Sequence, residues 1–259
     1  MRGLNAPDWL VARPIAHRGL HDRERGIVEN TLAAAEAAIA GNFALECDLQ
    51  MSADCEAFVF HDDTLDRLTD ASGRLMDKDA AEIHAARING EDAPPPTFGA
   101  FLATVAGRTP IVCELKSRFD RDFRLGDRAA ALAATYDGPL AFKSFDPILV
   151  AYLRLRWPDL GPTGRPCPLG IIAEGAYDDP YWSFLSPEQR RDFADWEALM
   201  RCEPDFLSFN VDHLPHATPF FMKEIGHLPV MAWTVRSAAQ REPARKWADQ
   251  IIFEGEAGP

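Results

Sequence analysis

Short apolar runs that end in polar residues recur along the whole chain, with amphipathic stretches between them. The apolar runs predict strands near 14–17, 44–49, 110–115, 139–143, 168–173, 206–210, 229–235 and 250–253. Helical periodicity predicts helices at 30–40, 98–106, 121–136, 147–157, 187–200, 215–224 and 238–247. Strands that alternate with helices form parallel β/α units. Eight such strands predict an α/β fold, a (β/α)8 TIM barrel.

One apolar run does not fit the parallel scheme. Residues 58–61 follow the strand at 44–49 too closely for a parallel crossover, which needs about a dozen residues. The two segments therefore predict an antiparallel hairpin. Folding the hairpin brings His61 opposite Glu46 or Asp48, within a register step or two. The spacing thus predicts a histidine beside a pair of carboxylates.

We expect residues 1–259 to form a single barrel domain. The polar segment at about 62–97 ends in three consecutive prolines and has little helical pattern, so it predicts a small insertion after the second barrel strand. Two interpretations of the insertion stay open. It either covers the site at the end of the barrel or is a solvated excursion without a functional contact.

The composition excludes several classes of protein. With 47% hydrophobic residues the chain has enough apolar side chains for a buried core, and a net charge of −13 argues against a nucleic-acid surface. Five scattered cysteines without a CxxC pair predict reduced thiols. No apolar stretch reaches the ~20 residues that cross a bilayer, and the N-terminal residues lack the apolar core of a signal peptide. We expect a cytoplasmic protein without stable membrane insertion, and whether it forms a homo-oligomer stays open.

Three carboxylates lie at the ends of predicted strands: Glu46, Asp48 and Glu114. Alternation along the strand places Glu46 and Asp48 on one face. Unpaired carboxylates that share a pocket repel one another, and a divalent cation relieves that repulsion. Because all the ligands are oxygens, the set predicts Mg²⁺ or Ca²⁺ rather than zinc.

Cationic and titratable groups end neighbouring strands. Arg18 and Lys116 bring positive charge to the same rim, which together with a metal suits a phosphate group. His17 and His61 come from different strands, so one can lie on each side of the phosphorus as acid and base. Each residue alone also has an ordinary structural explanation. Their joint occurrence at successive strand ends is what favours a site.

Several short motifs occur in one order along the chain. They are His17-Arg18-Gly19, Glu29-Asn30-Thr31-Leu32, Leu45-Glu46-x-Asp48, His61-Asp62-x-x-Leu65-x-Arg67-x-Thr69, Pro96-Thr97-Phe98, Glu114-x-Lys116, Ser144-Phe145, Asn210 and Trp233-Thr234-Val235. From residue 14 to about 253 the chain resembles the glycerophosphodiester phosphodiesterase family.

The resemblance implies a barrel enzyme that hydrolyses small glycerophosphodiesters to glycerol 3-phosphate and an alcohol. It assigns metal binding to Glu46, Asp48 and Glu114, acid/base catalysis to His17 and His61, and phosphate binding to Arg18 and Lys116. Trp233 would form an apolar wall near the glycerol. Asn30 and Glu29 would organise the first loop, with Glu29 as the partner of a nearby cation. Direct attack by water and attack by the substrate's own hydroxyl both stay open.

The chain departs from the family pattern at three places. The loop at 20–28 is longer and more charged than usual, with Val28 where a proline is common. Arg236 stands where an asparagine is expected, and Glu254 where an aspartate is common. We expect none of the three to touch the metal or acid/base residues, so that they affect the choice of alcohol rather than the reaction.

Two alternative functions differ in what they require. A related barrel phospholipase that acts on lysolipids needs an apolar rim or a membrane-facing segment, for which the net charge and the N-terminal residues give no support. A protein that binds a phosphate compound without turnover requires the loss of an acid/base or metal residue, yet all five are present.

Overall fold

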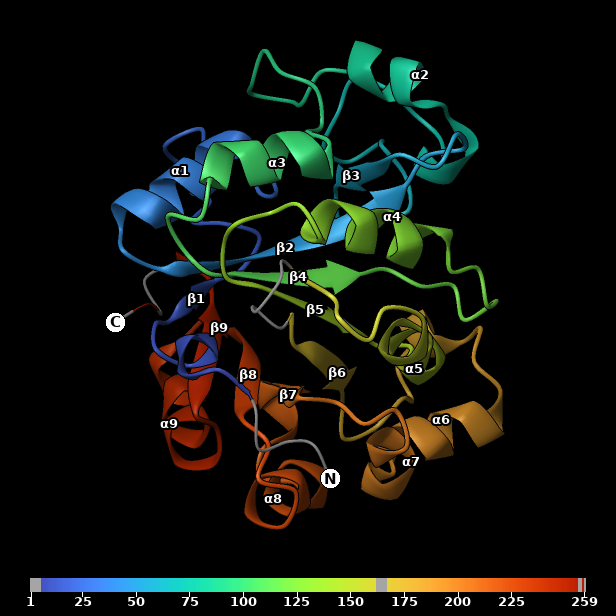
Figure 1. Ribbon diagram of the computed structural model, residues 1–259. Helices are drawn as coiled ribbons and strands as arrows, with labels where there is room; N and C mark the ends of the chain where they lie inside the picture. The colour runs from blue at the N-terminus through green and yellow to red at the C-terminus, as the bar shows by residue number, and fades with distance from the viewer. Residues whose placement is uncertain (1–5, 162–166, 256–257, 259) are drawn as a thin grey trace.

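The computed structural model describes residues 6–161, 167–255 and 258, and its strands close into a barrel surrounded by helices (Figure 1). Eight strands are parallel, and pairing of β1 with both β2 and β9 closes the ring. The strands are β1 (Ile15–Ala16), β2 (Ala44–Met51), β4 (Ile111–Leu115), β5 (Leu140–Ser144), β6 (Leu169–Ala173), β7 (Phe206–Asn210), β8 (Val230–Val235) and β9 (Gln250–Phe253). The predicted barrel and all eight of its strands are confirmed.

Helices follow the strands around the outside of the barrel. They are α1 (Leu32–Ala40), α3 (Phe98–Val105), α4 (Arg124–Ala133), α5 (Pro147–Arg156), α6 (Pro187–Ala194), α7 (Trp196–Met200), α8 (Ala217–Glu224) and α9 (Ala238–Trp247). The prediction of one helix over 187–200 is wrong. Asp195 has an extended backbone (φ −89°, ψ 117°) and divides the segment into α6 and α7.

Polar residues set the starts of the main helices. Thr31, Thr97, Asp146 and Ser237 each precede a helix, and each side chain accepts a hydrogen bond from a backbone N–H of the first turn. Such caps satisfy donors that have no partner within the helix. α5 and α9 begin directly after strands, since Asp146 lies two residues beyond β5 and Ser237 two residues beyond β8, whereas α1 and α3 follow longer segments.

The predicted hairpin is present. β3 (Ala57–Val59) pairs antiparallel with the end of β2, with Leu49 opposite Val59 and Met51 opposite Ala57. The backbone N–H of Phe60 donates to the carbonyl of Asp48 at 2.9 Å. The chain thus returns beside Asp48 immediately before His61, as the spacing predicts.

The insertion at 62–97 packs around apolar residues of its own. It holds the short helix α2 (Ala80–Ala85), seen beside β3 in Figure 1, and a 3₁₀ turn at Leu75–Asp77. These apolar residues form one buried cluster with two residues of the hairpin. The cluster consists of Phe58, Phe60, Leu65, Leu75 and Ile83. The insertion is therefore anchored on the hairpin rather than only solvated.

The inside of the barrel is apolar at one level and polar at the next. Ile15, Ala44, Val112 and Ile252 belong to one buried apolar cluster within the barrel. Because side chains alternate along a strand, the residues two positions further face the same interior. Those positions are His17, Glu46, Glu114 and Glu254. The second level is thus built from titratable groups.

The cysteines lie apart from one another or pair only through hydrogen bonds. All five cysteines are free, and the sulfurs of Cys47 and Cys113 lie 3.4 Å apart, at hydrogen-bond distance and without a disulfide. Over the part of the chain that the structure describes, no helix combines the length and apolar character needed to cross a membrane.

Candidate active site

A cavity of about 210 Å³ opens at the carboxyl ends of the barrel strands. Its lining includes seven of the eight predicted site residues: His17, Arg18, Asp48, His61, Glu114, Lys116 and Trp233. The eighth, Glu46, is fully buried and contacts three residues of the lining: His17, Arg18 and Lys143. The fold therefore brings all the predicted residues to one place.

Glu46, Asp48 and Glu114 form a group that suits a divalent cation. One carboxylate oxygen from each lies within 4.8 Å of the others, and all three residues are buried. Oε1 of Glu46 and Oδ1 of Asp48 accept no hydrogen bond of ordinary geometry, although each has a lysine ammonium nearby. Buried oxygens without hydrogen bonds are available as ligands, and an all-oxygen set fits Mg²⁺ or Ca²⁺.

Lysines balance part of the charge of these carboxylates. Lys116 Nζ lies 2.8 Å from Asp48 Oδ1 and 2.6 Å from Glu114 Oε1. Lys143 Nζ lies 3.1 Å from Glu46 Oε1, and Lys143 is 3% exposed. Lys143 is not among the site residues predicted from the sequence. A lysine among the apolar residues of a predicted barrel strand was the available signal, because an unpaired buried ammonium is costly.

The pKa shifts follow from these contacts. Burial works to raise the pKa of Asp48, but the charge of Lys116 and further cations outweigh it and hold the pKa well below its usual value. Burial works to lower the pKa of Lys116, and the charges of Asp48 and Glu114 raise it instead. Both groups are therefore charged near neutral pH, as a site for a cation and a phosphate requires.

His17 hydrogen-bonds to a residue that we expected to be remote. Its Nδ1 donates to Glu254, and the second oxygen of Glu254 accepts from Arg236 Nε at 2.6 Å. The expectation that neither departure at 236 and 254 touches an acid/base residue is wrong. The side chains lie together because β1 and β9 are neighbours in the barrel, although 237 positions separate His17 from Glu254.

His61 has an equivalent arrangement. Its Nδ1 lies 2.7 Å from Oδ1 of the adjacent Asp62, which also pairs with Arg67 of the insertion. Arg67 reaches on to Glu29 at 2.7 Å, and Glu29 pairs with Arg18 at the same distance. Glu29 is thus the partner of two cations. The pairing of Asp62 and Arg67 with each other was not foreseen, although both stand in the motif that begins at His61.

Asn30 fixes the position of Asp48. Its Nδ2 donates to Asp48 Oδ2 at 2.9 Å, and its Oδ1 accepts from the backbone N–H of Asp48 at 3.2 Å. Asn30 has φ 58°, a left-handed conformation that asparagine tolerates better than most residues. Asn30 therefore orients a predicted metal ligand.

The other side of the cavity is aromatic. The rings of Phe145 and Trp233 have centroids 5.6 Å apart, and those of Phe145 and Trp182 are 5.0 Å apart. The buried Nε1 of Trp233 has no hydrogen-bond partner. An unpaired buried N–H beside a cavity is a donor for a bound molecule.

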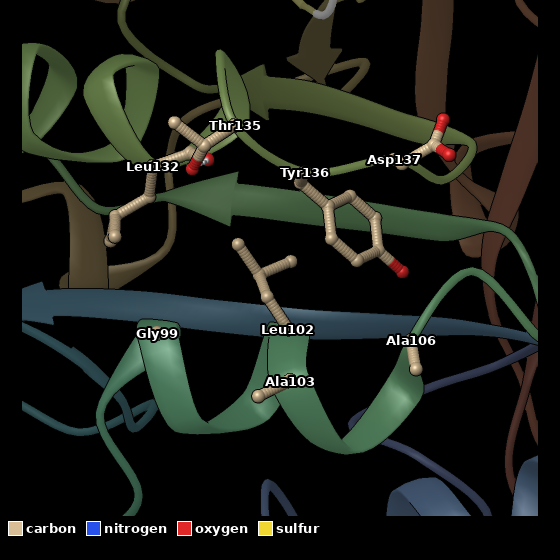
Figure 2. A pocket seen from close by; sticks show the side chains of 8 residues that line it. All are labelled: Gly99, Leu102, Ala103, Ala106, Leu132, Thr135, Tyr136 and Asp137. Atoms are coloured by element: carbon tan, nitrogen blue, oxygen red, sulfur yellow. Dashed lines mark hydrogen bonds between the residues drawn. The ribbon is translucent and has the colours of Figure 1, made fainter.

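A larger cavity, of about 410 Å³, lies on the outside of the barrel (Figure 2). Figure 2 shows Leu102 of α3 pointing toward Tyr136 and Leu132, the latter at the end of α4. No predicted site residue lines this cavity, and the Tyr136 hydroxyl already accepts from the backbone N–H of Gly107 at 2.9 Å. The larger volume of this cavity is therefore no evidence that it is the active site.

Curated proteins are similar in sequence to part of the chain. The chain is 49% identical over 79 residues to Glycerophosphodiester phosphodiesterase 1 of Bos taurus, a match that covers 30% of this chain and 22% of that protein. The protein of the same name from Rattus norvegicus is 48% identical over 65 residues, or 24% of this chain and 18% of the relative. The matched segments thus span about a fifth of these relatives.

Solved structures resemble nearly the whole chain. A phosphodiesterase from Oleispira antarctica in complex with the product sn-glycerol-3-phosphate has a TM-score of 0.74 at 19% identity, and the match covers 95% of this chain and 93% of that one. A glycerophosphodiester phosphodiesterase from Thermotoga maritima has a TM-score of 0.67 at 20% identity and covers 92% of each chain. At this level of identity the likeness concerns the fold.

A match to a family model shows which protein family the chain belongs to. The model of the glycerophosphoryl diester phosphodiesterase family matches residues 17–155, more than half of the chain. The matched range runs from His17 through Glu46, Asp48 and His61 to beyond Lys116. The chain belongs to the glycerophosphoryl diester phosphodiesterase family.

Proposed function

We propose that the protein is a metal-dependent enzyme that hydrolyses glycerophosphodiesters to glycerol 3-phosphate and an alcohol. One observation carries the proposal: three carboxylates whose arrangement suits a divalent cation lie at one cavity together with two histidines and the cationic side chains of Arg18 and Lys116. Family membership supports the same activity. So does the fold shared with the Oleispira antarctica phosphodiesterase, which binds sn-glycerol-3-phosphate as its product.

The chain's own residues bind and orient the phosphate in this proposal. Glu46, Asp48 and Glu114 would hold Mg²⁺ or Ca²⁺, which when bound neutralises charge on the phosphoryl oxygens. Arg18 and Lys116 line the same cavity and supply further positive charge. Trp233 would contact the glycerol side of the substrate, where its unpaired N–H offers a donor.

His17 and His61 carry out the proton transfers of the reaction, one as the base and the other as the acid. Each ring uses Nδ1 for a carboxylate, so Nε2 is the nitrogen left for the substrate. One histidine accepts the proton of the attacking hydroxyl as the new P–O bond forms. The other gives a proton to the alcohol oxygen as its P–O bond breaks. The attacking group is water or the glycerol hydroxyl, and the second route forms a cyclic phosphate that water then opens.

Hydrolysis of glycerophosphocholine and glycerophosphoethanolamine tests the proposal. We expect turnover that a chelator abolishes and that added Mg²⁺ or Ca²⁺ restores. His17→Ala and Glu46→Ala should each reduce kcat at least about a hundredfold, since each removes a proton carrier or a metal ligand. Lysophosphatidylcholine serves as the comparison substrate for the phospholipase alternative.

Two matched variants lie outside the cavity. His84→Ala and Glu224→Ala change exposed residues of α2 and α8 and should leave kcat unchanged. Turnover that persists with chelator, or full activity in His17→Ala, contradicts the mechanism. Binding of the diesters without turnover at saturating Mg²⁺ and Ca²⁺ contradicts the enzyme assignment and favours a binding protein.

A further inference from the structure

The cavity contains one carboxylate that the proposed reaction does not use. Glu174 follows β6 directly, lines the cavity and is half-buried. The two other carboxylates of the lining, Asp48 and Glu114, are both paired with Lys116. Among the described residues, no lysine or arginine forms an ion pair with Glu174. Its negative charge is therefore available to a bound molecule.

The surroundings of Glu174 are aromatic and polar rather than cationic. Its neighbours include the side chains of Trp182, Asn210 and His213. Burial raises the pKa of Glu174, and these neighbours only partly oppose that effect. Nδ1 of His213 accepts a hydrogen bond at 3.0 Å from the backbone N–H of Gly175, the residue after Glu174. A half-buried carboxylate in this setting gains most from a positive partner.

Aromatic rings surround the same end of the cavity. Phe145, Trp182 and Trp233 come from three different parts of the barrel, and Phe145 contacts the other two rings. Tyr181, 65% exposed, stands at right angles to Trp182 with centroids 4.8 Å apart, at the mouth. Aromatic faces attract ammonium groups, and quaternary ammonium compounds are commonly bound in this way.

The aromatic wall is held in place from behind. Trp182 is 2% exposed and packs against Tyr177, which is also buried, with ring centroids 5.0 Å apart. Leu185 and Phe193 complete this buried cluster. Because the cluster fixes Trp182, the wall is formed before a ligand binds, which reduces the entropy lost on binding.

Position around the barrel separates this end from the phosphate end. β6, which leads to Glu174, is four strands from β1 in either direction around the ring. β1 leads to His17 and Arg18, and the neighbouring β2 and β4 carry the metal-binding carboxylates. The cavity thus offers cations and a metal site on one side, and a carboxylate with aromatic rings on the other.

We propose that the alcohol part of the substrate carries a positively charged amine, and that this ammonium group binds between Glu174 and the rings of Phe145 and Trp182. The inference rests on the proposed function and deepens it. It assigns the preferred substrates to glycerophosphodiesters of amino alcohols, quaternary or primary, over those of neutral alcohols.

A pair of substrates of equal shape tests the charge directly. Glycerophosphocholine is compared with the diester of 3,3-dimethylbutanol, in which a carbon replaces the quaternary nitrogen. We expect wild-type kcat/KM to be about tenfold higher for the choline diester, a size typical of a desolvated ammonium on aromatic faces. Glu174→Gln should remove most of this preference by lowering kcat/KM for the choline diester alone.

Asp178→Asn is the matched control, because it removes an exposed carboxylate of the same loop outside the cavity lining. It should keep the wild-type preference. Equal kcat/KM of the wild type for the two diesters overturns the inference, and that comparison requires no variant to fold. An equal loss on both diesters in Glu174→Gln also overturns it, because Glu174 would then bind the shared glycerol phosphate.

Binding measured without turnover separates this inference from the proposed function. Isothermal titration of the wild type with choline should show binding that Glu174→Gln weakens about tenfold or more. Failure to hydrolyse either diester overturns the proposed function, while choline binding that depends on Glu174 still supports the cation site. Choline binding that Glu174→Gln leaves unchanged overturns the cation site.

Discussion

At the scale of single residues, both cavity histidines are held by a carboxylate that an arginine holds in turn. The two sets are His17–Glu254–Arg236 and His61–Asp62–Arg67. A carboxylate at Nδ1 fixes the ring orientation and the tautomer, and it stabilises the ring when it gains a proton at Nε2. Burial works to raise the pKa of Glu254, but the hydrogen bonds of His17 and Arg236 outweigh it and lower the pKa.

The first prediction concerns Glu254→Gln. We expect kcat for glycerophosphocholine to fall about ten- to a hundredfold with a nearly unchanged KM. The amide still accepts the hydrogen bond from His17 but no longer supplies the charge that favours the protonated ring. Steady-state kinetics with saturating metal measure both constants.

Glu224→Gln makes the same chemical change at an exposed position of α8 and should keep the wild-type kcat. A Glu254→Gln variant with wild-type kcat would mean that the charge of Glu254 contributes nothing to proton transfer. An increase in KM alone would place Glu254 in substrate binding instead.

At the scale of elements, close packing between β6 and β7 fills the barrel interior. Gly170 of β6 lies one residue before Ile171, which pairs with Leu207 of β7. A Cβ at Gly170 would lie 2.3 Å from ring atoms of Phe206, which is fully buried. The aromatic ring therefore occupies the space that a side chain at 170 would need.

The second prediction is that Gly170→Ala destabilises the protein by about 1–3 kcal/mol, as overpacking of a close-packed core does. Urea unfolding at constant metal concentration measures the change. Phe206→Leu in the same chain should recover part of the loss, because it removes the ring that the new methyl group meets.

Gly99→Ala is the matched control. Gly99 lies in α3, where the nearest atom to an added Cβ is 3.8 Å away, and alanine favours helices over glycine. This variant should be as stable as the wild type or slightly more so. Equal stability of Gly170→Ala and the wild type would contradict the packing that we describe.

At the scale of the whole molecule, ion pairs at the end of the barrel make stability depend on pH. Burial tends to raise the pKa values of Asp62 and Glu254, but their hydrogen bonds and cationic partners lower both below the ordinary values of 3.8 and 4.5. A carboxylate with a lowered folded-state pKa stabilises the protein above its unfolded-state pKa. That contribution is lost as the pH falls from the unfolded-state pKa toward the lower folded-state pKa.

The third prediction follows from the lowered pKa values of Asp62 and Glu254. The free energy of unfolding should stay level from about pH 7 to about pH 5 and fall by roughly 1–3 kcal/mol toward about pH 3. Chemical unfolding at each pH, with chelator present throughout, measures the curve. Glu254→Gln should flatten the acidic part because it removes one of the titrating groups.

Glu224→Gln should reproduce the wild-type curve, since Glu224 is exposed on α8. Stability that rises as the pH falls from about 5 to about 3 would contradict the assigned direction of these pKa shifts. An unchanged slope in Glu254→Gln would assign the acid sensitivity to other carboxylates.

The sequence by itself determined the elements and most of the candidate site. Strand and helix periodicity is a local property, so all eight barrel strands could be predicted, as could the hairpin that returns beside Asp48. Residues at the ends of parallel strands necessarily gather at one end of a barrel. For that reason the sequence alone assigns Glu46, Glu114 and His61 to one site.

Only the tertiary structure decided which charges pair. Closure of the ring places Glu254 against His17, and strand register places Lys143 against Glu46. Such contacts depend on distances between residues far apart in the chain, which periodicity does not carry. The cation-binding role that we propose for Glu174 has the same origin, because a lone glutamate after a strand acquires meaning only from the rings that surround it.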